Sequence, residues 1–90
     1  MKRKSNKVKG PVTSYEIWKN RIEINPDIKG GKPVIRGTRV PVEIVLGSLA
    51  AGMSFEEICA SYVISTEDIK ACLAFSAAVL SEEKFFAISR

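Results

Sequence analysis

A stretch rich in lysine, arginine and glycine is the densest chemical signal in the sequence. It runs from Lys29 to Arg39 and reads KGGKPVIRGTR. Glycine leaves backbone N–H groups open to close approach, and basic side chains attract phosphate, so a loop of this composition can hold a phosphate backbone. Its spacing matches neither a P-loop nor a dinucleotide-binding fingerprint. The alternative is a hairpin whose glycines serve turn geometry and whose basic side chains are solvated.

Residues for catalysis or metal binding do not form a recognisable set. The chain has no histidine, which removes the usual general base and the commonest metal ligand. Cys59 and Cys72 lie in apolar stretches without a second pair of ligands, and we expect them to be small buried side chains. We therefore expect no enzyme activity, no metal, no cofactor and no small-molecule substrate.

Neither an export signal nor a membrane span is recognisable in the sequence. The apolar runs are too short to cross a bilayer, and no apolar segment follows the basic start. Two cysteines cannot form a disulfide framework. We expect a cytoplasmic protein without membrane contact.

Charge is divided unevenly along the chain, which has 14 Lys and Arg against 10 Asp and Glu. Residues 1–41 hold eleven basic and three acidic side chains, whereas residues 42–90 hold three basic and seven acidic ones. The basic half suits nucleic-acid phosphate, and the acidic half suits a partner with a basic surface. Alternatively, the basic start is only a solvated terminal tail.

Ninety residues predict one domain, with a flexible basic arm at 1–14, a folded part at 15–80 and a C-terminal tail at 81–90. The large side chains of residues 15–18 are expected to cover one edge of the core. Alternation over residues 21–24, the glycine pair Gly30–Gly31 and a second apolar run at 33–36 predict a β-hairpin between 21 and 40.

Three helices are predicted after the hairpin. The first spans 42–51, with Pro41 at its start and Gly52 at its end. The second spans 55–62 and begins with a Ser54–Glu57 capping box. The third spans 66–80, where Ser65 and Asp68 repeat the pattern. The predicted fold class is mainly α, with a short N-terminal β-hairpin followed by a three-helix, helix-turn-helix bundle.

The third predicted helix is too apolar for the surface of a monomer, because only Lys70 and Ser76 are polar between Ile69 and Leu80. One face is expected to meet the core: Ile69, Cys72, Leu73, Ser76 and Leu80. Phe75 and Val79 point to another side, where we expect a second chain. The alternative is that these two residues pack under the N-terminal hairpin.

The C-terminal tail is charged and then apolar, with Phe85, Phe86 and Ile88 near its end. Such side chains suit a groove on a partner protein. Alternatively, the tail extends the last helix and folds back on the core.

The run GKPVIRGTRVPV from Gly31 to Val42 resembles domain-of-unknown-function family 433, DUF433. The resemblance spans about Arg21 to Leu80 and includes further stretches: NPDI at 25–28, AAGMS at 50–54, EI at 57–58 and EDI at 67–69. It implies a homeodomain-like helix-turn-helix fold. It also implies an antitoxin of a type II toxin–antitoxin pair, which binds its operator DNA as a dimer and blocks a PIN-like ribonuclease toxin. The family commonly has a cysteine near Lys29, and its replacement here speaks further against a metal or redox role.

Two sets of contact residues follow for an antitoxin-like protein. Acidic Glu67 and Asp68 at the start of the third helix would repel a duplex, so the hairpin and the arm are the better candidates for DNA contact. The expected DNA-binding residues are Lys32, Arg36, Thr38, Arg39, Thr66 and Lys70. The expected partner-binding residues are Phe75, Val79, Phe85, Phe86 and Ile88. Two alternatives are a stand-alone helix-turn-helix transcriptional regulator and a protein-binding adaptor that never contacts DNA.

Overall fold

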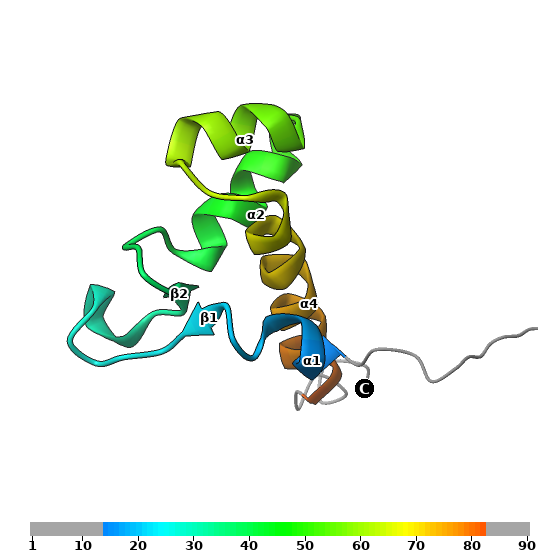
Figure 1. Ribbon diagram of the computed structural model, residues 1–90. Helices are drawn as coiled ribbons and strands as arrows, with labels where there is room; N and C mark the ends of the chain where they lie inside the picture. Colours follow the sequence, from blue (N-terminus) through cyan, green and yellow to red (C-terminus); the bar gives the residue numbers. More distant parts are fainter. Residues whose placement is uncertain (1–13, 83–90) are drawn as a thin grey trace, which may run out of the picture.

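The computed structural model describes residues 14–82, apart from the side chain of Glu82. Figure 1 shows a bundle of helices with a small hairpin on one side. In chain order the elements are α1 (Ser14–Trp18), β1 (Ile22–Glu23), the 3₁₀ turn η2 (Lys29–Gly31), β2 (Val34–Ile35), α2 (Val42–Ala50), α3 (Phe55–Tyr62) and α4 (Thr66–Glu82). The predicted class, mainly helical with a short antiparallel hairpin, is confirmed.

The hairpin is shorter than predicted, with two residues in each strand. Within the strands, Ile22 lies opposite Ile35. Just outside them, the Arg36 N–H donates to the Arg21 carbonyl at 2.8 Å. Gly37 has a φ of 82°, and the Thr38 N–H donates to the Ile35 carbonyl, which closes a tight turn after β2. Both isoleucines are buried, so the hairpin is stabilised by packing on the helices rather than by its own length.

The helix starts match the sequence predictions because capping depends on residues close in sequence. The Glu57 N–H donates to Ser54 Oγ at 3.0 Å, and the Ser54 N–H donates to Glu57 Oε1 at 2.8 Å. Ser65 and Asp68 make the same reciprocal pair at 3.1 and 3.0 Å. The expected end of the first predicted helix is also present, since Gly52 has a φ of 99°.

The helix α1 was not predicted. It has five residues and packs along α4, and Figure 1 shows it lying across the lower part of α4. Trp18 meets Phe75 edge to face, with ring centroids 4.8 Å apart. Of the large side chains expected to cover an edge of the core, Trp18 does so, whereas Tyr15 and Ile17 are 56% and 40% exposed. Ser14, which was assigned to the arm, belongs to α1. The rest of the expected arm lies outside the described residues.

The core lies between α2, α3, α4 and the hairpin. Its buried members are Ile22, Ile35, Val42, Val45, Ile58, Ile64, Ile69, Ala71 and Cys72. The expected inward face of α4 is partly wrong, because Leu73 and Leu80 are 43% and 56% exposed. Ala71 and Ala74 are buried instead, on the side of α4 that carries Phe75. Because α1 packs along α4, this chain itself covers two sides of the helix.

Candidate nucleic-acid and partner interfaces

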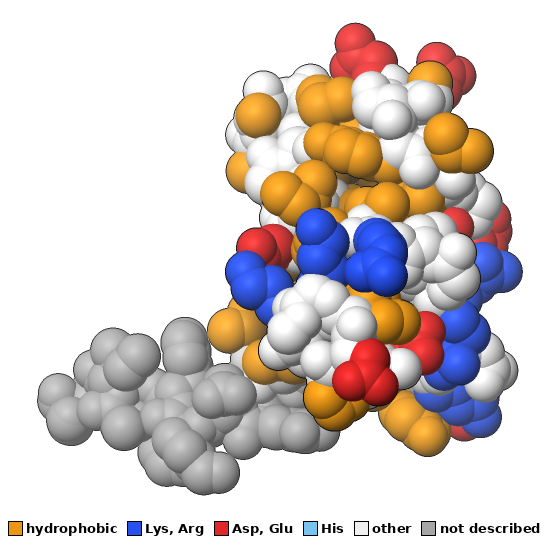
Figure 2. Space-filling view, turned by 90° about the vertical axis from the view of Figure 1, so that its left-hand side faces the viewer, with side chains coloured by type: hydrophobic (Ala, Val, Ile, Leu, Met, Phe, Trp, Pro, Cys, Tyr) orange, Lys and Arg blue, Asp and Glu red, His pale blue; other side chains and the backbone are white. Residues whose placement is uncertain are grey.

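Four basic side chains lie on the hairpin and its loops: Lys29, Lys32, Arg36 and Arg39. All four are exposed. Lys32 Nζ lies 3.0 Å from Glu43 Oε2 on α2, whereas the other three make no ion pair with a described residue. Figure 2 shows lysine and arginine side chains gathered across the middle of this face, below the apolar and acidic top of the molecule.

The loop that carries Arg36 and Arg39 is held by hydrogen bonds between the Thr38 hydroxyl and the backbone, and by a backbone pair. Thr38 Oγ1 donates to the Ile35 carbonyl at 2.7 Å and accepts from the Val40 N–H at 3.0 Å. The Val40 carbonyl accepts in turn from the Ile35 N–H at 2.9 Å. The hydroxyl of Thr38, an expected DNA contact, therefore holds the turn that presents the two arginines.

Arg21 connects the hairpin to α4. Its Nη1 donates to Asp68 Oδ1 at 3.1 Å, while the other oxygen of the same carboxylate accepts from the Ser65 N–H. Asp68 thus has two roles, since it caps α4 and also connects the hairpin to this helix. The sequence analysis missed this contact, since the two residues are 47 positions apart and no local pattern relates them.

The first turn of α4 carries the remaining expected DNA contacts. Thr66 and Lys70 are exposed. Lys70 Nζ lies 3.9 Å from Glu67 Oε2, a loose pair one helical turn apart. The acidic side chains of this turn are therefore paired: Asp68 with Arg21 and Glu67 with Lys70.

The folded part of the chain is not basic as a whole. Residues 14–82 contain seven Lys and Arg against nine Asp and Glu. No Lys or Arg occurs between Val40 and Ile69, a stretch with five acidic residues. Five of the basic side chains counted in the first half belong to residues 1–13, outside the described part. The basic surface of residues 14–82 is thus confined to the hairpin with its loops, the segment between α1 and β1, and Lys70.

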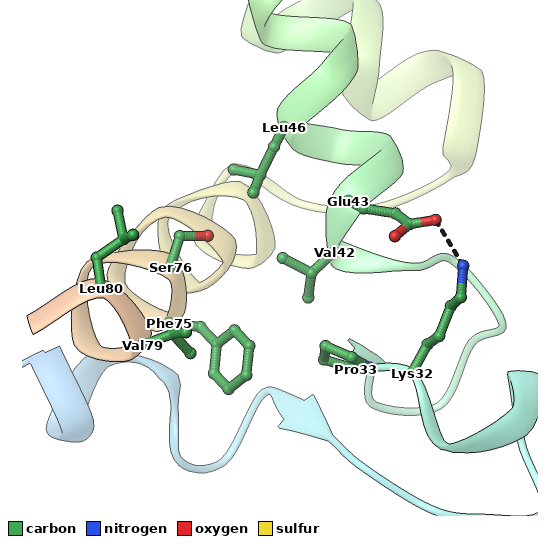
Figure 3. A pocket seen from close by; sticks show the side chains of 9 residues that line it. All are labelled: Lys32, Pro33, Val42, Glu43, Leu46, Phe75, Ser76, Val79 and Leu80. Atoms are coloured by element: carbon green, nitrogen blue, oxygen red, sulfur yellow. Dashed lines mark hydrogen bonds and ion pairs between the residues drawn. The ribbon is translucent and has the colours of Figure 1, made fainter. Parts of the chain in front are cut away.

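An apolar pocket of about 340 Å³ opens between the start of α2, the residues before β2 and the C-terminal half of α4. Its lining residues are Lys32, Pro33, Val42, Glu43, Leu46, Phe75, Ser76, Val79 and Leu80. Figure 3 shows the Lys32–Glu43 ion pair at one side of the pocket and Leu80 at the opposite side. Ser76 Oγ donates to the Cys72 carbonyl at 2.8 Å. The polar side chains of the lining, Lys32, Glu43 and Ser76, thus all have partners within the chain.

The structure brings two of the expected partner-binding residues together in this pocket. Phe75 is half-buried against Trp18 of α1, whereas the alternative interpretation had placed it under the hairpin. Val79 is 41% exposed. The other three expected residues, Phe85, Phe86 and Ile88, lie outside the described residues.

The thiol groups differ in environment. Cys72 is fully buried, and its burial together with the nearby Asp68 carboxylate raises the pKa of its thiol to about 12. Cys59 is half-buried, with Sγ 4.0 Å from Thr66 Oγ1. Within residues 14–82, no group of three or more acidic, cysteine or histidine side chains is arranged to hold a metal ion. In the same part of the chain, no helix has the length and apolar character that crossing a bilayer requires.

Comparison with known families identifies the hairpin and helices as one unit. The model of the family described as "Protein of unknown function (DUF433)" matches residues 22–76. The chain belongs to this family. The matched residues run from β1 into α4, and so include the loop of Arg36 and Arg39 and the helices α2 and α3.

Solved structures share this fold. A crystal structure of a DUF433 member from Anabaena variabilis has a TM-score of 0.64 and 30% identity, over 70% of this chain and 63% of that one. The structure of Rv2018 from Mycobacterium tuberculosis has a TM-score of 0.58 and 27% identity, over 66% of this chain and 28% of that one.

A curated relative matches a shorter segment. The uncharacterized protein y4eO of Sinorhizobium fredii is 62% identical over 34 residues, which are 38% of this chain and 15% of that protein. The chain thus spans a minor part of y4eO and somewhat less than two thirds of the Anabaena protein.

Proposed function

We propose that this DUF433 protein is an antitoxin-like DNA-binding protein of a type II toxin–antitoxin pair. It binds its own operator through the hairpin and neutralises a PIN-like ribonuclease toxin. The main support for DNA binding is the position of Arg36 and Arg39, two exposed guanidinium groups on one rigid loop with no ion-pair partner among the described residues. Guanidinium groups bind phosphate oxygens with two parallel hydrogen bonds, and a preformed loop loses little entropy on binding.

The first turn of α4 plays the smaller part in this proposal. Thr66 and Lys70 are close to the hairpin end of the bundle because Arg21, the cross-strand neighbour of Arg36, reaches Asp68. The pairing of Asp68 and Glu67 reduces their repulsion of a duplex. Lys32 can join the contact if phosphate replaces Glu43, since their ion pair is exposed and such pairs contribute little stability.

The acidic and apolar parts of the chain support the toxin side of the proposal. A ribonuclease groove is expected to be basic, and the stretch from Val40 to Ile69 carries acidic side chains and no basic ones. The membership in DUF433 adds to this, because the family resembles antitoxins that neighbour PIN-like toxins.

Titration of labelled DNA from upstream of the chain's own coding sequence tests the DNA contact. We expect binding at low salt that weakens steeply as salt is added. Arg36→Ala with Arg39→Ala is expected to weaken binding and reduce the slope of log K against log salt by about 2, since each lost phosphate contact contributes about 0.9. Lys19→Ala, directly after α1, is a control for loss of a basic side chain, because Lys19 Nζ lies 3.2 Å from Glu16 Oε1 and is outside the proposed contact.

The toxin contact is tested in two steps: the coding sequences beside that of this chain are searched for a PIN-like nuclease, and the nuclease is then co-expressed with the chain. The wild-type chain and the Arg36→Ala, Arg39→Ala variant are both expected to restore growth. Equal loss of DNA binding and toxin neutralisation in that variant would contradict two separate surfaces. The absence of any DNA binding at low salt would overturn the operator contact.

A protein-binding adaptor that does not contact DNA is the second candidate. The net negative charge of residues 14–82 favours it, because most DNA-binding domains are basic overall. Nuclease neutralisation without any salt-dependent DNA binding would select this candidate.

A further inference from the structure

We propose that two copies of this chain associate through the C-terminal half of α4, each copy covering the pocket of the other. Two features carry this inference: an apolar stripe on α4 and the open pocket beside it. The proposal extends the expected dimer to a specific surface, and it does not depend on the proposed DNA or toxin binding.

The stripe consists of Leu73, Ala77 and Leu80. Steps of four and three residues place these side chains on one face of a helix. All three are exposed, and the leucines are 43% and 56% accessible. No charged residue occurs from Ala71 to Ser81, and the hydroxyls of Ser76 and Ser81 both donate to carbonyls of the same helix, so this part of the helix suits contact with protein.

The pocket continues the stripe without a break because Leu80 belongs to both. It lies where the core ends: Ile69 and Cys72 are fully buried, whereas Val79 further along the helix is 41% exposed. Figure 3 shows the side chains of Phe75, Val42 and Leu46 around the space that remains. Its volume of about 340 Å³ is many times the roughly 30 Å³ that one water molecule takes up, so side chains of another chain can enter it.

A second copy of this chain fits the surface better than an unrelated partner, because the surface is complementary to itself. The two leucines lie symmetrically about the middle of the stripe. In an antiparallel pair of α4 helices, Leu73 of each copy therefore meets Leu80 of the other, and the two small Ala77 side chains let the helices approach closely. Among the described side chains, the charged groups at the pocket are Lys32 and Glu43, one of each sign. In a two-fold dimer in which these pocket edges meet, Lys32 of each copy can lie against Glu43 of the other. A basic toxin would require an excess of acidic groups at this surface.

The oligomeric state of the full chain tests the stripe. Sedimentation equilibrium is expected to give twice the 9.9 kDa chain mass for the wild type. Leu73→Lys with Leu80→Lys is expected to raise the dissociation constant at least tenfold. The matched control is Ile24→Lys with Val63→Lys, which places two lysines at side chains 59% and 87% exposed elsewhere, and it is expected to remain dimeric. A monomeric wild type, or equal effects of the two double variants, overturns the proposal.

A mixing experiment tests the pocket edge. Lys32→Glu makes the edge doubly negative and Glu43→Lys makes it doubly positive, so each variant alone is expected to dissociate more readily than the wild type. An equimolar mixture is expected to form heterodimers in native mass spectrometry, because opposite edges then face each other. If homodimers and heterodimers form only in the proportions expected for random association, the two pocket edges do not meet.

The residues after α4 are an alternative occupant of this surface, and one variant distinguishes them from a second copy. Phe85→Ser with Phe86→Ser in the full chain leaves the stripe and pocket unchanged, so dimerisation is expected to be unaffected. If this variant dissociates while Leu73→Lys with Leu80→Lys does not, the apolar tail rather than α4 holds the dimer, and the proposed interface is wrong.

Discussion

The two ends of α4 are built from similar apolar residues but have opposite environments. Near its N-terminus the helix is capped by Ser65, tied to the hairpin by the Arg21–Asp68 pair, and packed so that Ile69 and Cys72 are fully buried. Near its C-terminus Val79 and Leu80 line an open pocket. The difference shows that apolar composition alone does not make a core, because the short helices α2 and α3 cover only part of the longer α4.

The largest expected effect compares truncations at the two ends. Ile69→Ala is expected to lower the free energy of unfolding by about 3 kcal/mol, because it leaves a cavity in a closed core. Leu80→Ala is expected to cost less than about 1 kcal/mol, because the side chain is already 56% exposed. Urea unfolding at a protein concentration below the dimer dissociation constant measures both. Equal losses would contradict the contrast between the two ends.

The link between α4 and the hairpin is the next test. Asp68→Ala removes a cap and an ion pair together and is expected to cost about 2 kcal/mol. Glu57→Ala removes a capping-box side chain that makes no ion pair within residues 14–82 and is expected to cost about 1 kcal/mol. Thermal unfolding of the two variants compares them, and a larger loss for Glu57→Ala would show that the Arg21 contact contributes nothing.

The turn before α4 contains a strained residue whose replacement is expected to stabilise the fold. Val63 has a φ of 56°, which is unfavourable for a β-branched side chain, and it is 87% exposed, so its removal loses little packing. Val63→Gly is expected to raise the free energy of unfolding by about 1 kcal/mol. Val63→Ala keeps a Cβ in the same conformation and is expected to gain less. No gain for glycine would mean that Val63 makes a contact that offsets its strain.

The last expected effect concerns Cys72 and is absent at neutral pH, because it appears only in alkaline solution. Because its thiol has a pKa raised from 9.0 to about 12, the folded chain retains a proton that the unfolded chain releases. The stability linked to this proton is complete below pH 9.0 and is lost as the pH rises toward 12, with a slope of at most about 1.4 kcal/mol per pH unit. Cys72→Ala is expected to reduce the decline in urea unfolding between pH 9 and 11. An unchanged decline would assign it to other groups.

Local features of the fold were predictable from the sequence. The Ser54–Glu57 box, the Ser65–Asp68 cap and Gly52 depend on residues within one helical turn, so the starts of α3 and α4 and the end of α2 followed directly. The hairpin was predicted from alternation and glycine, although its strands are shorter. The short helix α1 could not be predicted, since it is stabilised by the contact of Trp18 with Phe75, 57 positions away.

The candidate surfaces were predictable only as sets of residues. The sequence identified Arg36 and Arg39 as basic and Phe75 and Val79 as apolar. It did not separate Thr38, whose hydroxyl holds the turn, from the arginines that the turn presents. It also placed Leu73 and Leu80 in the core, because periodicity defines the faces of a helix but does not say which neighbours cover them.

The sequence by itself determined the order of the elements, their caps and turns, the lack of histidine chemistry and the membership in DUF433, because each depends on residue types at short spacing. The tertiary structure decided which apolar residues are buried, which acidic groups are neutralised and where a pocket remains. Those outcomes depend on helix lengths and crossings, through which residues far apart in sequence come into contact, and no local pattern specifies them.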